Sequence, residues 1–157
     1  MFVQETAIVD VAWEQAASAF RQLTADYAAD RDADLELRRI GFEMPPLRVR
    51  RRVDMAFKEL EEAAPRVLTA VVEWRAAAAE GLFPVWEGRL EIAAHGSRRT
   101  RLTIHGNYFP PLGAAGEAVD QALMNRVARA SISDFLERLA ADLGRRAASS
   151  SSPASDG

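Results

Sequence analysis

The sequence predicts an α+β fold in which a meander of antiparallel strands packs against a long C-terminal α-helix. Between residues 47 and 108 the apolar residues recur with a period of two, which is typical of strands with one buried face. The opposite face of the same segments is charged, as in antiparallel sheets that face water on one side. Around this region, residues 13–23 and 115–144 carry apolar residues at helical spacing.

The N-terminal region reads as a strand followed by helix. Residues 2–11 alternate and predict a strand. An apolar helical stripe follows at residues 13–23, and Asp10 is well placed to cap its start. Residues 24–37 are acidic and alanine-rich and predict a second, more exposed helix, which Gly41 and the two following prolines would end.

Four strands are expected next, at residues 47–58, 67–76, 85–93 and 99–108. A charged bend at 59–65 separates the first two, and a tight turn at His95-Gly96 separates the last two. The charged face mixes signs, so cross-strand pairs such as Glu91 with Arg101 are expected to stabilise it mildly.

The last element, residues 115–144, is a helix whose apolar stripe changes face midway. We therefore expect it to touch two different surfaces, as a strongly twisted sheet would present. The first half of the stripe is Val119, Leu123, Val127 and Ala130, and the second half is Ile132, Phe135, Leu136, Leu139 and Leu143. Residues 1–146 then form a single domain, and the Ser/Ala/Pro/Gly-rich residues 147–157 form a disordered tail.

Composition excludes several classes of function. The chain has 157 residues, a net charge of −3 and no cysteine, which excludes disulfides, thiolate metal sites and a cysteine nucleophile. The two histidines lack ligand spacing, so no metal site is expected, and no motif for a phosphate or dinucleotide cofactor is present. The basic run at 48–53 alternates within a strand and is interpreted as a solvated face rather than a nucleic-acid site. With no signal peptide and no apolar run of the ~18 residues that a membrane span needs, a cytoplasmic protein is expected.

Three stretches carry a resemblance to a known superfamily. They are FVQETAIVDVAWEQAASAF, LFPVWEGRLEIAAHGSRRTRLTIHGNYFPP and GAAGEAVDQALMNRVARASISDFLERLAADL. Their order resembles the helix-grip fold of the SRPBCC superfamily, which includes START lipid-binding domains and polyketide cyclase-like proteins. The resemblance implies a curved antiparallel sheet wrapped around the C-terminal helix, with an apolar cavity for a lipid, a polyketide or another small hydrophobic molecule. No cofactor is expected.

Alternation in the strands nominates the residues that would line such a cavity. The predicted binding residues are Met55, Phe57, Trp74, Trp86, Leu90, Ile104 and Tyr108 from the strands, Phe109 at the rim, and Leu123, Met124 and Val127 from the helix. The same apolar residues would also face inward if the core were solid, so cavity wall and ordinary core both remain open.

Three polar residues are candidates for chemistry. Arg51 is the one charge on the inward face of its strand, and Asp120 lies beside the apolar stripe of the last helix. An Arg51–Asp120 pair would suit catalysis together with Tyr108, but Arg51 can also snorkel at the sheet edge while Asp120 favours the helix N-terminus. The sequence thus favours a module that binds a small hydrophobic molecule. The alternatives are a polyketide cyclase/dehydrase-type enzyme, and self-association as a homodimer through the outer face or a sheet edge.

Overall fold

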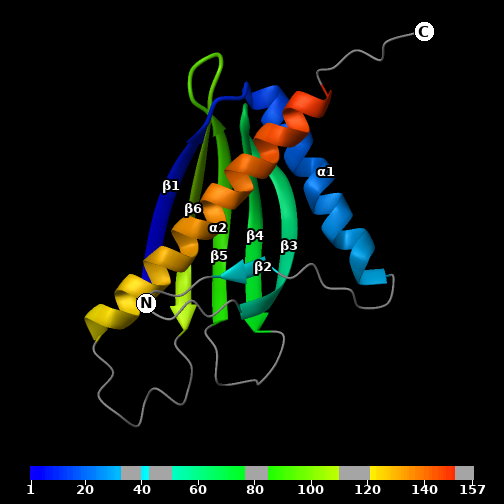
Figure 1. Ribbon diagram of the computed structural model, residues 1–157. Helices are drawn as coiled ribbons and strands as arrows, with labels where there is room; N and C mark the ends of the chain where they lie inside the picture. The colour runs from blue at the N-terminus through cyan, green and yellow to red at the C-terminus, as the bar shows by residue number, and fades with distance from the viewer. Residues whose placement is uncertain (33–39, 43–50, 77–84, 110–120, 151–157) are drawn as a thin grey trace, which may run out of the picture.

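The computed structural model describes residues 1–32, 40–42, 51–76, 85–109 and 121–150 (Figure 1). These form one sheet of six strands and two helices. In chain order the elements are β1 (Phe2–Val9), α1 (Trp13–Asp32), β2 (Ile40–Phe42), β3 (Arg51–Ala64), β4 (Val67–Ala76), β5 (Val85–Ala94), β6 (Thr100–Phe109) and α2 (Gln121–Ser150).

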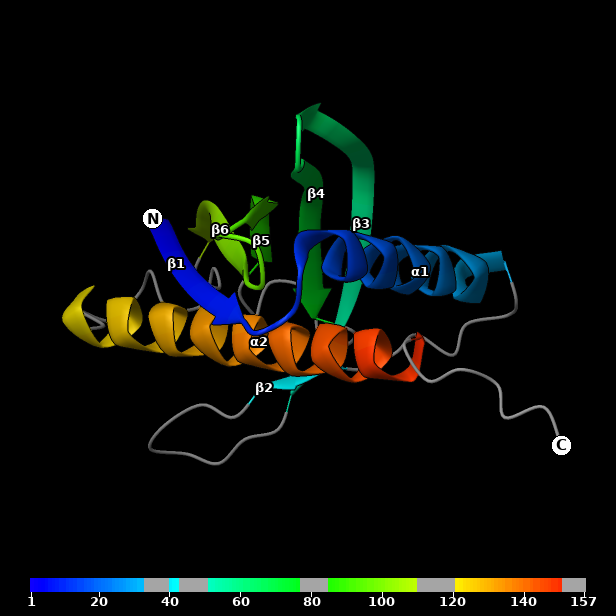
Figure 2. The ribbon, with the colours of Figure 1, turned by 90° about the horizontal axis from the view of Figure 1, so that it is seen from above.

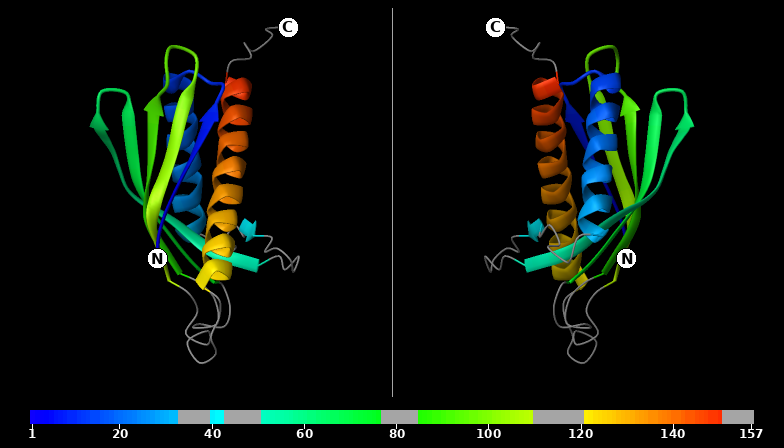
Figure 3. Two further views of the ribbon diagram at one scale, coloured as in Figure 1. Left: turned by 90° about the vertical axis from the view of Figure 1, so that its left-hand side faces the viewer. Right: turned by 90° about the vertical axis from the view of Figure 1, so that its right-hand side faces the viewer.

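The sheet is antiparallel throughout and has the strand order β1-β6-β5-β4-β3-β2. Both helices lie on the same face, which we call the inner face (Figure 3). The helix α2 contacts both edge strands, and seen from above it runs between β1 on one side and β2 on the other (Figure 2). A sheet that reaches a helix from both sides is curved around it, so the predicted α+β helix-grip fold is confirmed.

The N-terminal helix differs from the prediction of two helices. A single helix, α1, continues from Trp13 to Asp32. No glycine or proline interrupts this segment, and the hydroxyl of Thr24 donates within the helix to the carbonyl of Arg21 at 3.0 Å. The segment predicted as a second helix is therefore the continuation of the first as far as residue 32, and residues 33–37 lie outside the described residues.

The strands β2 and β3 also depart from the prediction. The expected bend at 59–65 is wrong, because β3 continues to Ala64 through two register shifts against β4, and Glu59 has a φ of 51°. Such β-bulges let a strand bend without ending. Charged residues suit this stretch because it is exposed and its Glu61 accepts a hydrogen bond from Arg89 at 3.3 Å. The three-residue strand β2, which pairs with β3, was not predicted.

The long helix α2 extends further than expected at its C-terminal end. It continues to Ser150, so residues 147–150 are helical rather than part of a tail. Ala147 is buried, and the hydroxyls of Ser149 and Ser150 donate to the carbonyls of Arg145 and Arg146 at 3.0 Å in each case. Residues 115–120 and 151–157 lie outside the described residues.

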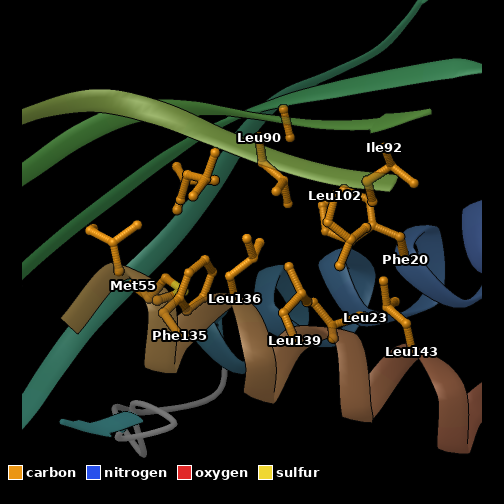
Figure 4. Close-up of a cluster of buried hydrophobic side chains, with 14 of the residues drawn as sticks. Phe20, Leu23, Met55, Leu90, Ile92, Leu102, Phe135, Leu136, Leu139 and Leu143 are labelled. Atoms are coloured by element: carbon orange, nitrogen blue, oxygen red, sulfur yellow. The ribbon is translucent and has the colours of Figure 1, made fainter. Parts of the chain in front are cut away.

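One end of the inner face is filled by aliphatic side chains. The second half of the predicted α2 stripe is buried as expected, with Phe135 2% and Leu136 1% exposed. Figure 4 shows side chains from α1, α2 and the sheet pointing toward one another. We call this set the aliphatic core after its predominant side chains; it comprises Leu23, Leu90, Ile92, Leu102, Leu136, Leu139 and Leu143, together with the aromatic ring of Phe20.

Hydrogen bonds fasten the corner between β1 and α1 onto this core. The indole Nε1 of Trp13 donates to the carbonyl of Ile92 at 3.3 Å, and the hydroxyl of Thr100 donates to the carbonyl of Val11 at 2.8 Å. The nearby turn closes through the His95 amide and the Arg99 carbonyl at 2.8 Å, and Gly96 has a φ of 76°. The predicted tight turn at His95-Gly96 is thus confirmed.

The outer face of the sheet is charged, as predicted. Arg101 pairs with Glu91 at 3.6 Å, and Lys58 pairs with Glu73 at 2.7 Å. These pairs are partly exposed, so each contributes only about 0–1 kcal/mol. Within the described ranges no helix is long and apolar enough to cross a membrane, and no cluster of acidic or histidine side chains suits a metal ion.

Candidate binding site

Four large side chains form a line across the inner face. Met55 pairs with Trp74, Trp74 with Trp86, and Trp86 with Tyr108, each on the neighbouring strand. In antiparallel strands such directly opposed residues share a face and contact one another. We call these four residues, three aromatic side chains and one methionine, the aromatic row. It lies close to the ends of β4 and β6 and the start of β5.

The aromatic row packs tightly. The rings of Trp74 and Trp86 are stacked, with centroids 5.2 Å apart and an interplanar angle of 17°. Phe135 of α2 covers Trp74 at a centroid distance of 5.4 Å. Trp86 is 0% and Met55 7% exposed, and the row belongs to the same continuous cluster as the aliphatic core. A ligand therefore reaches the row only when the covering side chains move apart.

A pair of glycines makes room for the Trp86 ring. Gly88 and Gly106 are opposite each other on β5 and β6, two register positions from the Trp86–Tyr108 pair and therefore on the same face. A Cβ on Gly88 would lie 2.6 Å from Cζ2 of Trp86, and one on Gly106 would lie 2.9 Å from the same atom. The indole thus occupies the space that two side chains would otherwise fill.

The Nε1–H of Trp86 is buried without a hydrogen-bond partner among the described residues. Trp13 shows the usual arrangement, since its Nε1 reaches a backbone carbonyl. Leaving a buried donor unsatisfied costs on the order of 1–3 kcal/mol. The row therefore contains one polar group whose hydrogen-bonding capacity the described part of the protein does not use.

Tyr108 is the one candidate for acid–base chemistry whose side chain is described. Burial raises the pKa of its hydroxyl to about 12. The hydroxyl consequently remains protonated at neutral pH, where it can donate a hydrogen bond or a proton but cannot act as a general base.

The predicted binding residues fall into three groups: seven on the inner face, one on the outer face, and three whose side chains lie outside the described residues. Seven lie on the inner face as predicted, namely Met55, Phe57, Trp74, Trp86, Leu90, Ile104 and Tyr108. Of these, Leu90 and Ile104 are 0% exposed, and Leu90 belongs to the aliphatic core. The ring of Phe57 packs edge-on against Phe20 of α1, with centroids 5.5 Å apart.

Phe109 is the exception among the described binding candidates. It follows Tyr108 directly in β6, so the period of two turns it to the outer face, where it is 46% exposed. It does not line the interior. Asp120 and the side chains of Arg51, Leu123, Met124 and Val127 lie outside the described residues, so the proposed Arg51–Asp120 pair stays a prediction.

Sequence reasoning missed the two glycines and the unpaired indole nitrogen. A signal for the glycines is present, because each is two residues from an aromatic member of the row, in Trp86-x-Gly88 and Gly106-x-Tyr108. Two such patterns in neighbouring strands indicate that a large ring lies flat over the sheet. No pattern reveals that the Trp86 nitrogen has no partner in the described part of the chain, since this depends on the final positions of distant groups.

No protein-family model and no curated protein matches the sequence. Solved structures do resemble it in fold. A conserved protein from Geobacillus kaustophilus matches with 13% identity and a TM-score of 0.55, over 92% of this chain and 96% of that one. Norcoclaurine synthase from Thalictrum flavum, in complex with dopamine and hydroxybenzaldehyde, matches with 10% identity and a TM-score of 0.54, over 98% and 89%.

A START superfamily protein from Mycobacterium smegmatis matches with 16% identity and a TM-score of 0.50, over 96% of this chain and 99% of that one. The resemblance to the START-like, helix-grip fold that the sequence indicated is therefore confirmed at the level of the fold. At these identities the likeness concerns the backbone arrangement alone, and chemistry has to be argued from the side chains of this chain.

Proposed function

We propose that this protein binds a small, mainly apolar molecule between the inner face of the sheet and α2, at the aromatic row. The observation that carries the proposal is the division of the inner face. Aliphatic side chains from both helices fill one end, whereas two stacked indoles, a tyrosine and a methionine gather at the other. Pockets for small molecules combine apolar and aromatic walls with a few polar groups in this way.

The residues of the row suit a ligand that enters by displacing side chains. Met55 is flexible and adapts to different shapes, and the half-buried Phe57 lies two residues further along β3 on the same face. Indole rings offer large, flat, polarisable surfaces to an aromatic or polyene ligand. The norcoclaurine synthase of the same fold holds two small aromatic molecules in its solved structure, which supports a ligand of similar size here.

A polyketide cyclase/dehydrase-type enzyme is the second candidate. The observation in its favour is the position of Tyr108, a buried hydroxyl group paired across the strands with Trp86 of the row, where it can donate a hydrogen bond to a ligand. Catalysis of this type also needs a base, for which Asp120 is the sequence candidate, with Arg51 as its partner. Release of a cyclised or dehydrated product by the wild-type protein, lost in Tyr108→Phe, would favour this candidate over binding alone.

Native mass spectrometry of the freshly purified protein tests the binding proposal first, by looking for a co-purifying apolar molecule. The second step is titration with N-phenyl-1-naphthylamine, a neutral probe that becomes fluorescent in apolar sites and accepts energy from tryptophan. We expect saturable binding that Trp74→Phe weakens by about 3- to 10-fold, because it removes ring area from the row.

Phe109→Ala is the matched control, since it removes an aromatic ring from the same sheet on its outer face. It should leave the affinity for the probe unchanged within about twofold. Absence of both a co-purifying molecule and saturable probe binding would reject the proposal. Equal weakening by Trp74→Phe and Phe109→Ala would place the site elsewhere.

A further inference from the structure

Resting on the proposed function, we infer that the ligand carries a neutral hydrogen-bond acceptor, such as a ketone, ester or ether oxygen, that the Nε1–H of Trp86 binds. Trp86 would then determine specificity, selecting oxygenated aromatic molecules over plain hydrocarbons of the same shape.

The first support is the state of the Trp86 nitrogen. The residue is 0% exposed and Nε1 has no partner in the described part of the chain. The ring lies over Gly88 and Gly106, which are opposite each other where β5 pairs with β6. Buried donors are almost always satisfied in native proteins, so a donor without a partner at a proposed ligand site indicates what the ligand supplies.

The second support is the position of the nitrogen within the row. Trp86 is one of the two inner residues of the row, flanked by its stacked partner Trp74 and by its cross-strand partner Tyr108. A planar ligand that packs against this row brings its substituents close to the indole edge. An oxygen there gains a hydrogen bond in a water-poor setting, where the net gain is largest.

The acceptor is expected to be neutral because of the side chains that surround the row. The buried polar residues of the described chain are Thr69, Thr100 and Ser131, so none of its buried side chains carries a positive charge. The described lysine and arginine ion pairs of the sheet, including those of Lys58, Arg89 and Arg101, are partly exposed. A carboxylate at the row would lose its hydration without gaining a cation from any described buried side chain, and this cost favours a neutral oxygen.

A matched pair of probes tests the inference. 2-Acetylnaphthalene and 2-isopropenylnaphthalene have the same planar shape, but the first has a carbonyl oxygen where the second has a methylene group. The quantity to measure is the ratio of their affinities, which cancels the lost packing of a variant. We expect Trp86→Phe to reduce the preference for the ketone by about 5- to 30-fold, the effect of losing one hydrogen bond in a buried site. Trp74→Phe removes the stacked neighbour instead and should leave this ratio within about twofold of the wild-type value.

Nuclear magnetic resonance of the ¹⁵N-labelled wild-type protein gives a readout that does not depend on the folding of a variant. The three tryptophans provide three indole N–H signals, and Trp13, already hydrogen-bonded, serves as the internal reference. The ketone should move the Trp86 signal downfield and slow its exchange with solvent, and the alkene should do neither.

The outcomes separate the two proposals. If neither probe binds saturably, the proposed function and this inference both fail. If both probes bind, but the ratio is the same in Trp86→Phe and the Trp86 signal responds equally to both, binding stands and the role of Trp86 is refuted.

Discussion

Substitution of Gly106 by alanine tests the close approach of the strands beneath the aromatic row. An added Cβ would lie 2.4 Å from both the carbonyl oxygen of Glu87 and the Cα of Gly88, and 2.9 Å from Cζ2 of Trp86. The first two atoms belong to the backbone of the paired strand, so no side-chain rotation relieves the contact. The strands β5 and β6 have to move apart locally, which weakens their hydrogen bonds and displaces the indole.

The expected loss can be bounded from these contacts. Overpacking of an interior site costs about 1–3 kcal/mol, and a clash with backbone atoms lies toward the upper part of that range. Alanine recovers roughly 0.5–1 kcal/mol relative to glycine in a strand. A net loss of about 2 kcal/mol remains, and for a chain of this length it lowers the melting temperature by roughly 4–8 °C.

Urea unfolding followed by far-ultraviolet circular dichroism measures this loss, and the near-ultraviolet signal reports on the stacked indoles. Gly144→Ala is the control, because its Cβ would meet only Cγ2 of Val9 at 3.9 Å in the interior of α2. There alanine should raise the stability by about 0.5–1 kcal/mol. If Gly106→Ala is as stable as the wild type with an unchanged near-ultraviolet signal, the ring does not lie over this glycine and the account of the row is refuted.

Three further predictions concern single groups. Because burial raises the pKa of Tyr108 to about 12 from its ordinary 10, its protonated form stabilises the fold fully below pH 10. Compared with Tyr108→Phe, the wild type should lose about 1.4 kcal/mol per pH unit between pH 10 and 12, measured by urea unfolding; equal slopes would contradict this. Trp13→Phe should lower the unfolding free energy by about 1–2 kcal/mol, since it removes a buried hydrogen bond to a β5 carbonyl, and a neutral effect would show that bond to be dispensable. Arg146→Met should lower the free energy of unfolding by about 0.5–1 kcal/mol in low salt and by less in high salt, because Arg146 joins α2 to Asp26 of α1 at 2.8 Å. The control Arg145→Met lies at a more exposed position and should change the midpoint of unfolding little.

The fold was largely predictable because burial on one side of a sheet or helix leaves a period in the sequence. The strands that became β1, β4, β5 and β6 followed from alternation alone. The wrong predictions concern segments whose residue types are also common in bends and at helix ends. Acidic residues at 59–62 were interpreted as a bend, but an exposed, bulged strand accommodates them beside Arg89. Thr24 marked no helix end, since its hydroxyl bonds within the helix.

The sequence predicts which large apolar residues lie together at the site, but not the hydrogen bonding of the polar group among them. Alternation placed Trp74, Trp86 and Tyr108 on one face, and the register made them neighbours. The same alternation should have excluded Phe109 from the interior, because adjacent residues of a strand point to opposite faces. Whether the Trp86 nitrogen has a partner among the described residues depends on three-dimensional packing, which no sequence period encodes.

The two ends of the inner face contribute differently to the stability of the fold. The aliphatic core joins both helices to the sheet, and the hydrogen bonds of Trp13 and Thr100 fasten the β1–α1 corner beside it. That end supplies stability through apolar burial. The aromatic row instead contains a donor without a partner among the described residues, on an indole that lies over two glycines. A sequence selected for stability alone would pair such a donor, so its cost supports the proposed binding of an acceptor-bearing ligand at the row, while the aliphatic core at the other end stabilises the fold.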